Sequence, residues 1–168
     1  MNEYKDLIMA DRLGVVKIDS EKEYLAHMLC LGGTCRYRFN EREFELHAGD
    51  LSIIRKRKMI DKVQPSEDFR CKIIYATPEF IELSTPQSNY GMKGSLALFL
   101  NPVMHLTPEQ QIVCRRDFEQ LELRIQNSGH HFYQETLINA MQATILDFLT
   151  STQVCTVKVI YQHRMPPL

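Results

Sequence analysis

The histidines of this chain are the side chains best suited to metal binding or proton transfer, and their spacing argues against a metal centre. A strand that chelates a metal presents two histidines one residue apart, because alternate residues point to the same face. His27 and His47 each lack a histidine two residues away. His105 falls outside the predicted strands, and His130 and His131 are adjacent, so their side chains diverge. We therefore predict no metal and no cofactor, with the histidines in surface or packing roles.

Motifs for nucleophilic catalysis and phosphate binding are weak as well. The chain has no Gly-x-Ser-x-Gly sequence to hold a serine in the strained turn of a hydrolase. Gly32-Gly33 is typical of a strand-end turn and Gly91-x-x-Gly94 of a loop, so neither indicates a phosphate cradle. The alternative that a Ser or Cys nucleophile is assembled with a His and a carboxylate from distant parts of the sequence stays open. No catalytic residue is predicted, and an enzyme is the minority interpretation.

The densest charge on the chain is the basic run Arg55-Lys56-Arg57-Lys58. Its simplest interpretation is a solvated loop at the rim of a barrel. Two alternatives remain open. The run forms a mouth that attracts a carboxylated or phosphorylated ligand, or it contacts DNA phosphate or a neighbouring domain.

The bulk composition indicates a cytoplasmic protein of one compact unit. Twenty basic and 21 acidic residues give a net charge of -1, without the positive balance of a nucleic-acid binder. No leader-like N-terminus or long apolar segment predicts export or a membrane span. The cysteines are odd in number and never form a Cys-x-x-Cys pair, so we predict buried free thiols. They are Cys30, Cys35, Cys71, Cys114 and Cys155.

The elements that must position these side chains change character along the chain. Up to about residue 85, apolar residues alternate with polar ones in short runs separated by turn signals, the pattern of a small barrel or sandwich. Strands are predicted over residues 15–18, 25–31, 35–39, 44–46, 51–54 and 69–76. A polar break at Asn40-Glu41-Arg42 predicts a hairpin.

From Thr107 the apolar spacing becomes helical. Thr107 is a predicted N-cap, followed by Pro108 and Glu109 in the first turn, and the helix should run to about Gln126. A second helix is predicted over residues 131–149, antiparallel to the first. Residues 85–106 are predicted to be loop with a short helix over 95–100, and residues 151–168 an irregular, β-prone tail. The predicted division is therefore 1–106, 107–150 and 151–168.

These features resemble the N-terminal regulatory domain of AraC-family bacterial transcriptional regulators, a cupin-like double-stranded β-helix. The likeness covers about residues 17–149. The residues that carry it are Gly32-Gly33-Thr34, Phe39-Asn40-Glu41, Phe44-Glu45-Leu46, Gly49-Asp50-Leu51, Ser66-Glu67-Asp68-Phe69, Ile73-Ile74-Tyr75 and Glu79-Phe80. The fold class expected is mainly β with α, a cupin-like barrel followed by an antiparallel helical hairpin.

The resemblance implies a domain that senses a small-molecule effector and dimerises, without catalysis. In the family, DNA is contacted by a C-terminal helix-turn-helix region, and no segment after Leu149 has the length, charge or period for one. We expect either a shortened chain or a reading frame that was cut short. In the second case the tail no longer has the family's normal sequence.

Candidate ligand residues come from the predicted barrel interior, which is more often a packed core than a pocket. If an effector binds, the polar groups expected to meet it are Tyr37, Arg55 and Tyr75. The predicted inward positions are Met28, Cys30, Tyr37, Phe39, Phe44, Leu46, Ile53, Cys71, Ile73 and Tyr75.

The first helix has a broader apolar stripe than one buried face needs. Because the family dimerises through its hairpin, a homodimer is expected with Phe118, Leu121 and Ile125 near the seam; the alternative is that both faces are used internally. Two other functions stay open. One is a small cupin enzyme, an isomerase or lyase acting on a sugar or small acid, and the other is an interaction module that pairs with an intact paralogue.

Overall fold

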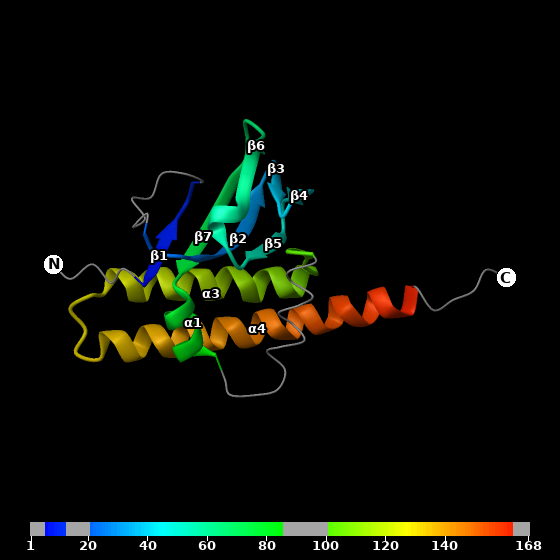
Figure 1. The fold of residues 1–168 in the computed structure, drawn as a ribbon. Helices are drawn as coiled ribbons and strands as arrows, with labels where there is room; N and C mark the ends of the chain where they lie inside the picture. The colour runs from blue at the N-terminus through cyan, green and yellow to red at the C-terminus, as the bar shows by residue number, and fades with distance from the viewer. Residues whose placement is uncertain (1–5, 13–20, 86–100, 163–168) are drawn as a thin grey trace.

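A computed structural model describes residues 6–12, 21–85 and 101–162 of the chain, with side chains placed up to residue 151. Within these ranges the molecule has two antiparallel sheets and a pair of long helices that lie along one side of the larger sheet (Figure 1). The expected class, mainly β with α in a cupin-like arrangement, is confirmed.

The larger sheet has five strands in the order β1-β7-β2-β5-β8. Its central strands are continuous apolar runs rather than alternating ones, and all five residues of β5 are buried. Such a pattern is expected where a sheet is covered on both faces. The bounds are β1 Leu7–Ala10, β2 Leu25–Gly32, β5 Asp50–Ile54, β7 Arg70–Ala76 and β8 Val103–His105.

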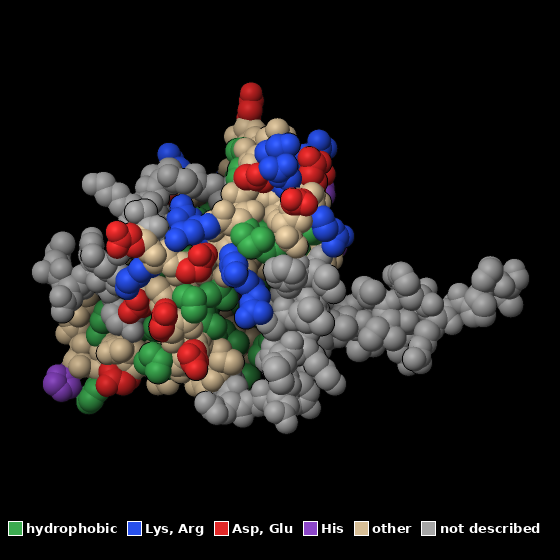
Figure 2. Space-filling view, viewed as in Figure 1, with side chains coloured by type: hydrophobic (Ala, Val, Ile, Leu, Met, Phe, Trp, Pro, Cys, Tyr) green, Lys and Arg blue, Asp and Glu red, His purple; other side chains and the backbone are tan. Residues whose placement is uncertain are grey.

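The smaller sheet has the order β4-β3-β6, with bounds β3 Thr34–Phe39, β4 Arg42–His47 and β6 Ile60–Pro65. Asn40 and Glu41 both have positive φ in the two-residue turn between β3 and β4, which matches the twist of the paired strands. Gly33, at φ 66°, turns the chain from one sheet to the other. A Cβ at this position would lie 2.7 Å from the Phe69 backbone, so the close corner requires glycine. Figure 2 shows acidic and basic side chains interspersed over the outer end of this sheet.

Two Thr-Pro-Glu sequences begin helices in the same way. Thr77 caps α1 (Pro78–Ser84), where its hydroxyl accepts a hydrogen bond from the Phe80 N–H at 3.3 Å. Thr107 caps α3 (Pro108–Gln126) and forms a reciprocal capping box with Gln110. Helix α4 (Tyr133–Gln162) returns antiparallel to α3 and extends beyond it (Figure 1).

Two apolar clusters lie on opposite faces of the five-stranded sheet. The barrel interior is the cluster between the two sheets, and its members include Met28, Cys30, Tyr37 and Tyr75. The helix-side cluster joins the other face of the sheet to the helices, and its largest members include Phe80, Phe118 and Phe148. Neighbouring residues of each central strand therefore enter different clusters.

The prediction of inward residues is correct except at Ile53. This residue belongs to the helix-side cluster, and its neighbour Ile54 faces the barrel interior. Within a run buried on both sides, apolar character carries no information on which residue faces which side. Phe44 is half-buried and packs against the interior cluster.

Several predicted elements need correction. Residues 77–84 form α1 rather than part of the strand region, although Thr77-Pro78-Glu79 carries the same start signal as Thr107. His105 is not outside the strands, because β8 pairs with β5 and sets His105 opposite Asp50. Strands β1 and β6 were not predicted. The predicted strand over 15–18 and the short helix over 95–100 lie outside the described residues.

The predicted end of the second helix at Leu149 and the irregular tail after it are wrong up to residue 162, since α4 continues to Gln162. Residues 150–162 contain neither glycine nor proline, and a helix that is already formed propagates through β-branched residues at small cost.

Phe118 should be the strongest single contributor of α3 to stability, because it is 0% exposed within the helix-side cluster. We predict that Phe118→Ala lowers the free energy of unfolding by about 3–5 kcal/mol. Glu119→Ala, at an exposed position of the same helix, should change it by less than about 0.5 kcal/mol. Urea unfolding followed by circular dichroism measures both, and equal losses would contradict the assignment of α3 faces.

Candidate functional site

The barrel interior holds one fully buried polar pair. The hydroxyls of Tyr37, on β3, and Ser52, on β5, lie 2.7 Å apart and hydrogen bond across the two sheets. Burial raises the pKa of Tyr37, and the bond to Ser52 opposes the rise only in part. The phenol is neutral and its hydrogen bond is already made, so this pair fastens the sheets together.

At the edge of the interior, Arg57 lies over the ring of Tyr75. The guanidinium carbon is 5.4 Å from the ring centroid, within the range of a cation–π interaction. The Arg57 N–H donates to the Tyr24 carbonyl at 3.0 Å, which fixes the start of the 3-10 turn η1 (Arg57–Met59) after β5. Burial raises the pKa of Tyr75, and the charge of Arg57 lowers it in part. We call Arg57, Tyr75 and Tyr24 the barrel mouth.

The structure brings two of the three predicted ligand residues together. Tyr37 and Tyr75 both belong to the interior cluster. Arg55 is exposed at the end of β5, and Arg57 is the basic residue that lies against Tyr75. The sequence carried no signal for this choice, because the basic run leaves the strand and its side-chain direction is set by the 3-10 turn.

Three of the cysteines, Cys30, Cys35 and Cys71, also lie in the interior. The four cysteines whose side chains are described are buried and free, as predicted; Cys155 lies outside the described side chains. Burial raises the pKa of Cys35 to about 11 and that of Cys71 to about 12. Thiols with such values remain protonated near neutral pH and make poor nucleophiles.

The histidines occupy separate environments. His27 is buried on the helix side of β2, stacked on Phe148 with ring centroids 5.8 Å apart, and burial lowers its pKa to about 4. His105 Nδ1 lies 2.8 Å from Asp50 on the surface. Among the described residues, no three His, Cys, Asp or Glu side chains converge as a metal site.

Comparison with known proteins gives one family. Residues 23–131 match the AraC-like ligand binding domain. This chain belongs to that family. No curated protein sequence matches. Among solved structures, the AraC-like transcriptional activator CuxR is similar with a TM-score of 0.56 and 13% identity, over 89% of this chain and 52% of CuxR. The chain thus spans about half the length of CuxR, and the likeness supports the fold.

Membership of the AraC-like family makes this a regulatory, ligand-binding domain, as predicted. The family points away from catalysis and toward recognition. Over the described residues, no helix combines the length and apolar character needed to cross a bilayer.

The residues predicted to lie near a dimer seam are on α3 and pack within the single chain. Phe118 and Leu121 are each 0% exposed in the single chain, where they pack in the helix-side cluster, so neither can meet a second copy. Ile125 is half-buried against the same cluster. The broad apolar stripe arises because α3 packs on both the sheet and α4. Its exposed apolar residues are Ile112 and Leu123.

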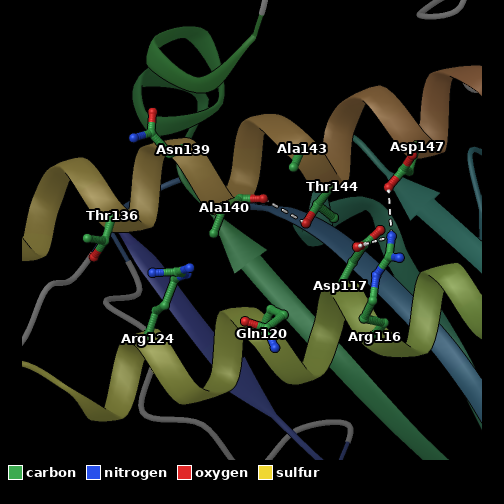
Figure 3. A pocket seen from close by; sticks show the side chains of 10 residues that line it. All are labelled: Arg116, Asp117, Gln120, Arg124, Thr136, Asn139, Ala140, Ala143, Thr144 and Asp147. Carbon is green, nitrogen blue, oxygen red and sulfur yellow. Dashed lines mark hydrogen bonds and ion pairs between the residues drawn. The ribbon is translucent and has the colours of Figure 1, made fainter.

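A second polar feature lies between α3 and α4, where an open groove of about 390 Å³ runs along the hairpin (Figure 3). Arg116 Nη2 stands 3.6 Å from Asp117 Oδ1 and 3.7 Å from Asp147 Oδ2. Burial first, and then the neighbouring carboxylate of Asp147, raise the pKa of Asp117 to about 6, with Arg116 opposing. We call this the hairpin groove. No sequence motif indicated it, because its residues come from two helices.

Asp117 makes the stability of the domain depend on pH in an unusual direction. Because its pKa is raised in the folded state from 3.8 to about 6, the folded protein holds this proton more tightly, and stability falls as the pH rises from about 4 to about 6. Asp117→Asn removes the buried charge and should raise the free energy of unfolding above pH 7 by about 1–3 kcal/mol. The gain should shrink toward pH 4. Urea unfolding at both pH values measures it, and a loss of stability at pH 7.5 would contradict the assignment.

Proposed function

We propose that this chain is the effector-sensing and dimerising part of an AraC-type transcriptional regulator. Its effector is a small molecule with an anionic group, bound at the barrel mouth. DNA contact belongs to a helix-turn-helix module of the kind found in full-length regulators, and a cytoplasmic location follows from action on DNA. No catalysis is assigned, in keeping with the protonated thiols of the interior.

The position of Arg57 over Tyr75 is the observation that carries this proposal. An arginine that lies against a buried aromatic ring holds its guanidinium at a fixed position, where it can pair with the anionic group of a ligand. Tyr75 is only 3% exposed, so the guanidinium is the part of the mouth that a ligand contacts. Arg55, Lys56 and Lys58 surround it in sequence and add to the positive potential that attracts an anion. Tyr37 and Ser52 bond to each other deeper in the barrel, so the mouth is where an effector finds donors to bind.

Exchange of Arg57 tests the site. Thermal unfolding is measured with a panel of small carboxylated and phosphorylated compounds, and a compound that raises the Tm is then titrated. Arg57→Gln should weaken its binding at least about tenfold, because a charge-assisted contact of about 1.5–3 kcal/mol is lost.

Arg55→Gln is the matched control, because Arg55 belongs to the same basic run but is exposed. It should change the affinity less than about threefold, as expected of a rim charge. An equal loss of affinity in both variants would mean that the effector is held by general electrostatic attraction and would contradict a specific site at Arg57. An effector that binds Arg57→Gln with unchanged affinity would overturn the proposed site.

The dimer part of the proposal rests on the exposed face of α3. Ile112 and Leu123 are 69% and 60% exposed and lie about three helical turns apart, on one side of the helix. A second copy of the helix, packed along this side, would cover both apolar side chains at once. This face replaces the buried Phe118 and Leu121 as the proposed seam.

Leu123→Glu should convert a dimer to a monomer in size-exclusion chromatography with light scattering, because a charge is buried unpaired at the seam. Leu83→Glu serves as the control, since Leu83 is equally exposed, at 62%, but lies on α1. A dimer that survives Leu123→Glu, or dissociates in Leu83→Glu alone, would place the seam elsewhere.

A further inference from the structure

We propose that the hairpin groove is a second ligand site, which takes a small organic cation with a primary ammonium or guanidinium group on the carboxylates of Asp117 and Asp147. This goes beyond the barrel-mouth effector, since the two sites have opposite charge preferences and lie on different elements.

The groove has the dimensions of a ligand site. Its volume of about 390 Å³ falls in the range of small-molecule pockets. Ala140 and Ala143 line it on α4, and these small side chains leave the space between the helices open (Figure 3). Polar groups that can hydrogen bond to a ligand come from both helices, among them Gln120 and Asn139.

Asp117 supplies the argument for a cation. Its side chain lines the groove, the residue is only 7% exposed, and Oδ2 is inaccessible to water without a hydrogen-bond partner among the described residues. A buried carboxylate in this state is costly unless a donor neutralises it. Such a group is therefore poised to gain from a ligand that brings charged N–H donors.

The charges around Asp117 leave its neutralisation incomplete. Asp147 brings a second carboxylate from α4, which is close enough to hydrogen bond to Asp117 only when one of the two acids holds a proton. Arg116 approaches both acids at 3.6 and 3.7 Å, longer than a hydrogen bond, and its side chain is 62% exposed. On α3, Cys114 is a protonated thiol and Arg115 faces solvent, so neither completes the pair. Two acids share one loosely held cation.

Arg124 adds a second requirement at the other end of the groove. It lies seven residues after Asp117 on α3, about 10 Å along the helix axis. Figure 3 shows the two side chains at opposite ends of the groove with Gln120 between them. A ligand with a cation at one end and a carboxylate at the other matches both ends, so a long basic amino acid should bind better than a simple amine.

Three related compounds separate these contributions in calorimetric titrations at pH 7.5. Arginine carries both groups, agmatine lacks the carboxylate, and citrulline replaces the guanidinium with a neutral group of similar shape. We expect arginine to bind more tightly than agmatine and citrulline to show no saturable binding. Citrulline binding as tightly as arginine, or no saturable arginine binding at millimolar concentrations, would overturn the proposal.

Variants locate the site. Asp117→Asn should fold with greater stability. It should lower the affinity for arginine at least about tenfold, because a charged hydrogen-bonded contact is lost. Arg124→Gln should lower the affinity for arginine to that for agmatine and leave agmatine unchanged. Glu119→Gln is the matched control, an exposed acid of the same helix outside the groove, and should leave both affinities unchanged. An unchanged affinity for arginine in Asp117→Asn would contradict the proposed site.

Two further variants separate this site from the proposed function. Arg57→Gln should keep full arginine affinity. A barrel mouth that binds no anion therefore does not contradict the hairpin-groove site, and a groove that binds no arginine does not contradict the barrel-mouth site. Leu123→Glu should also bind arginine normally. Arginine binding seen only in that variant would assign the groove to a second copy of the chain and overturn the proposal.

Discussion

Burial of both faces of the five-stranded sheet is the constraint on which the rest of the molecule depends. One face closes the barrel against the three-stranded sheet, and the other supports the helices. Each central strand must therefore supply apolar residues at successive positions, and any residue that moves by one position changes cluster. His27 shows how strict this is, because a titratable ring on the helix side is held neutral against Phe148.

The same arrangement joins the barrel mouth to the helices. On β7, Tyr75 of the barrel mouth faces the interior, while its neighbours Ile74 and Ala76 pack in the helix-side cluster with Phe118. Lys72 on β7 adds an ion pair to Glu122 on α3. A change at the mouth therefore has a direct mechanical route, one strand thick, to the helix that carries the proposed dimer face. The proposed effector site and the proposed dimer face are thus separated by a single sheet.

The hairpin groove differs from this apolar framework in placing charged side chains around a buried carboxylate. The carboxylates of Asp117 and Asp147 share one loose arginine, and the pKa of Asp117 rises accordingly. Elsewhere on α3, Cys114, Phe118 and Leu121 are buried in the helix-side cluster, and this packing sets the position of Asp117 on the helix. Natural chains retain such groups at functional positions despite their cost in stability.

Much of the fold was readable from the sequence, because it depends on local pattern. Alternation and turn signals determined the strands from β2 to β5 and β7, and Thr107-Pro108 with Gln110 determined the start of α3. Strands β1, β6 and β8 have little alternation of their own and form by pairing with strands distant in sequence. The family, the buried thiols and the inward tyrosines could thus be predicted from local pattern and resemblance. Three features depend instead on how the elements pack: Arg57 rather than Arg55 reaches Tyr75, Phe118 faces inward, and Asp117 meets Asp147. Each of these depends on which side of a helix or strand a neighbouring element packs against. The period of apolar residues shows that a side is buried but does not show which element covers it.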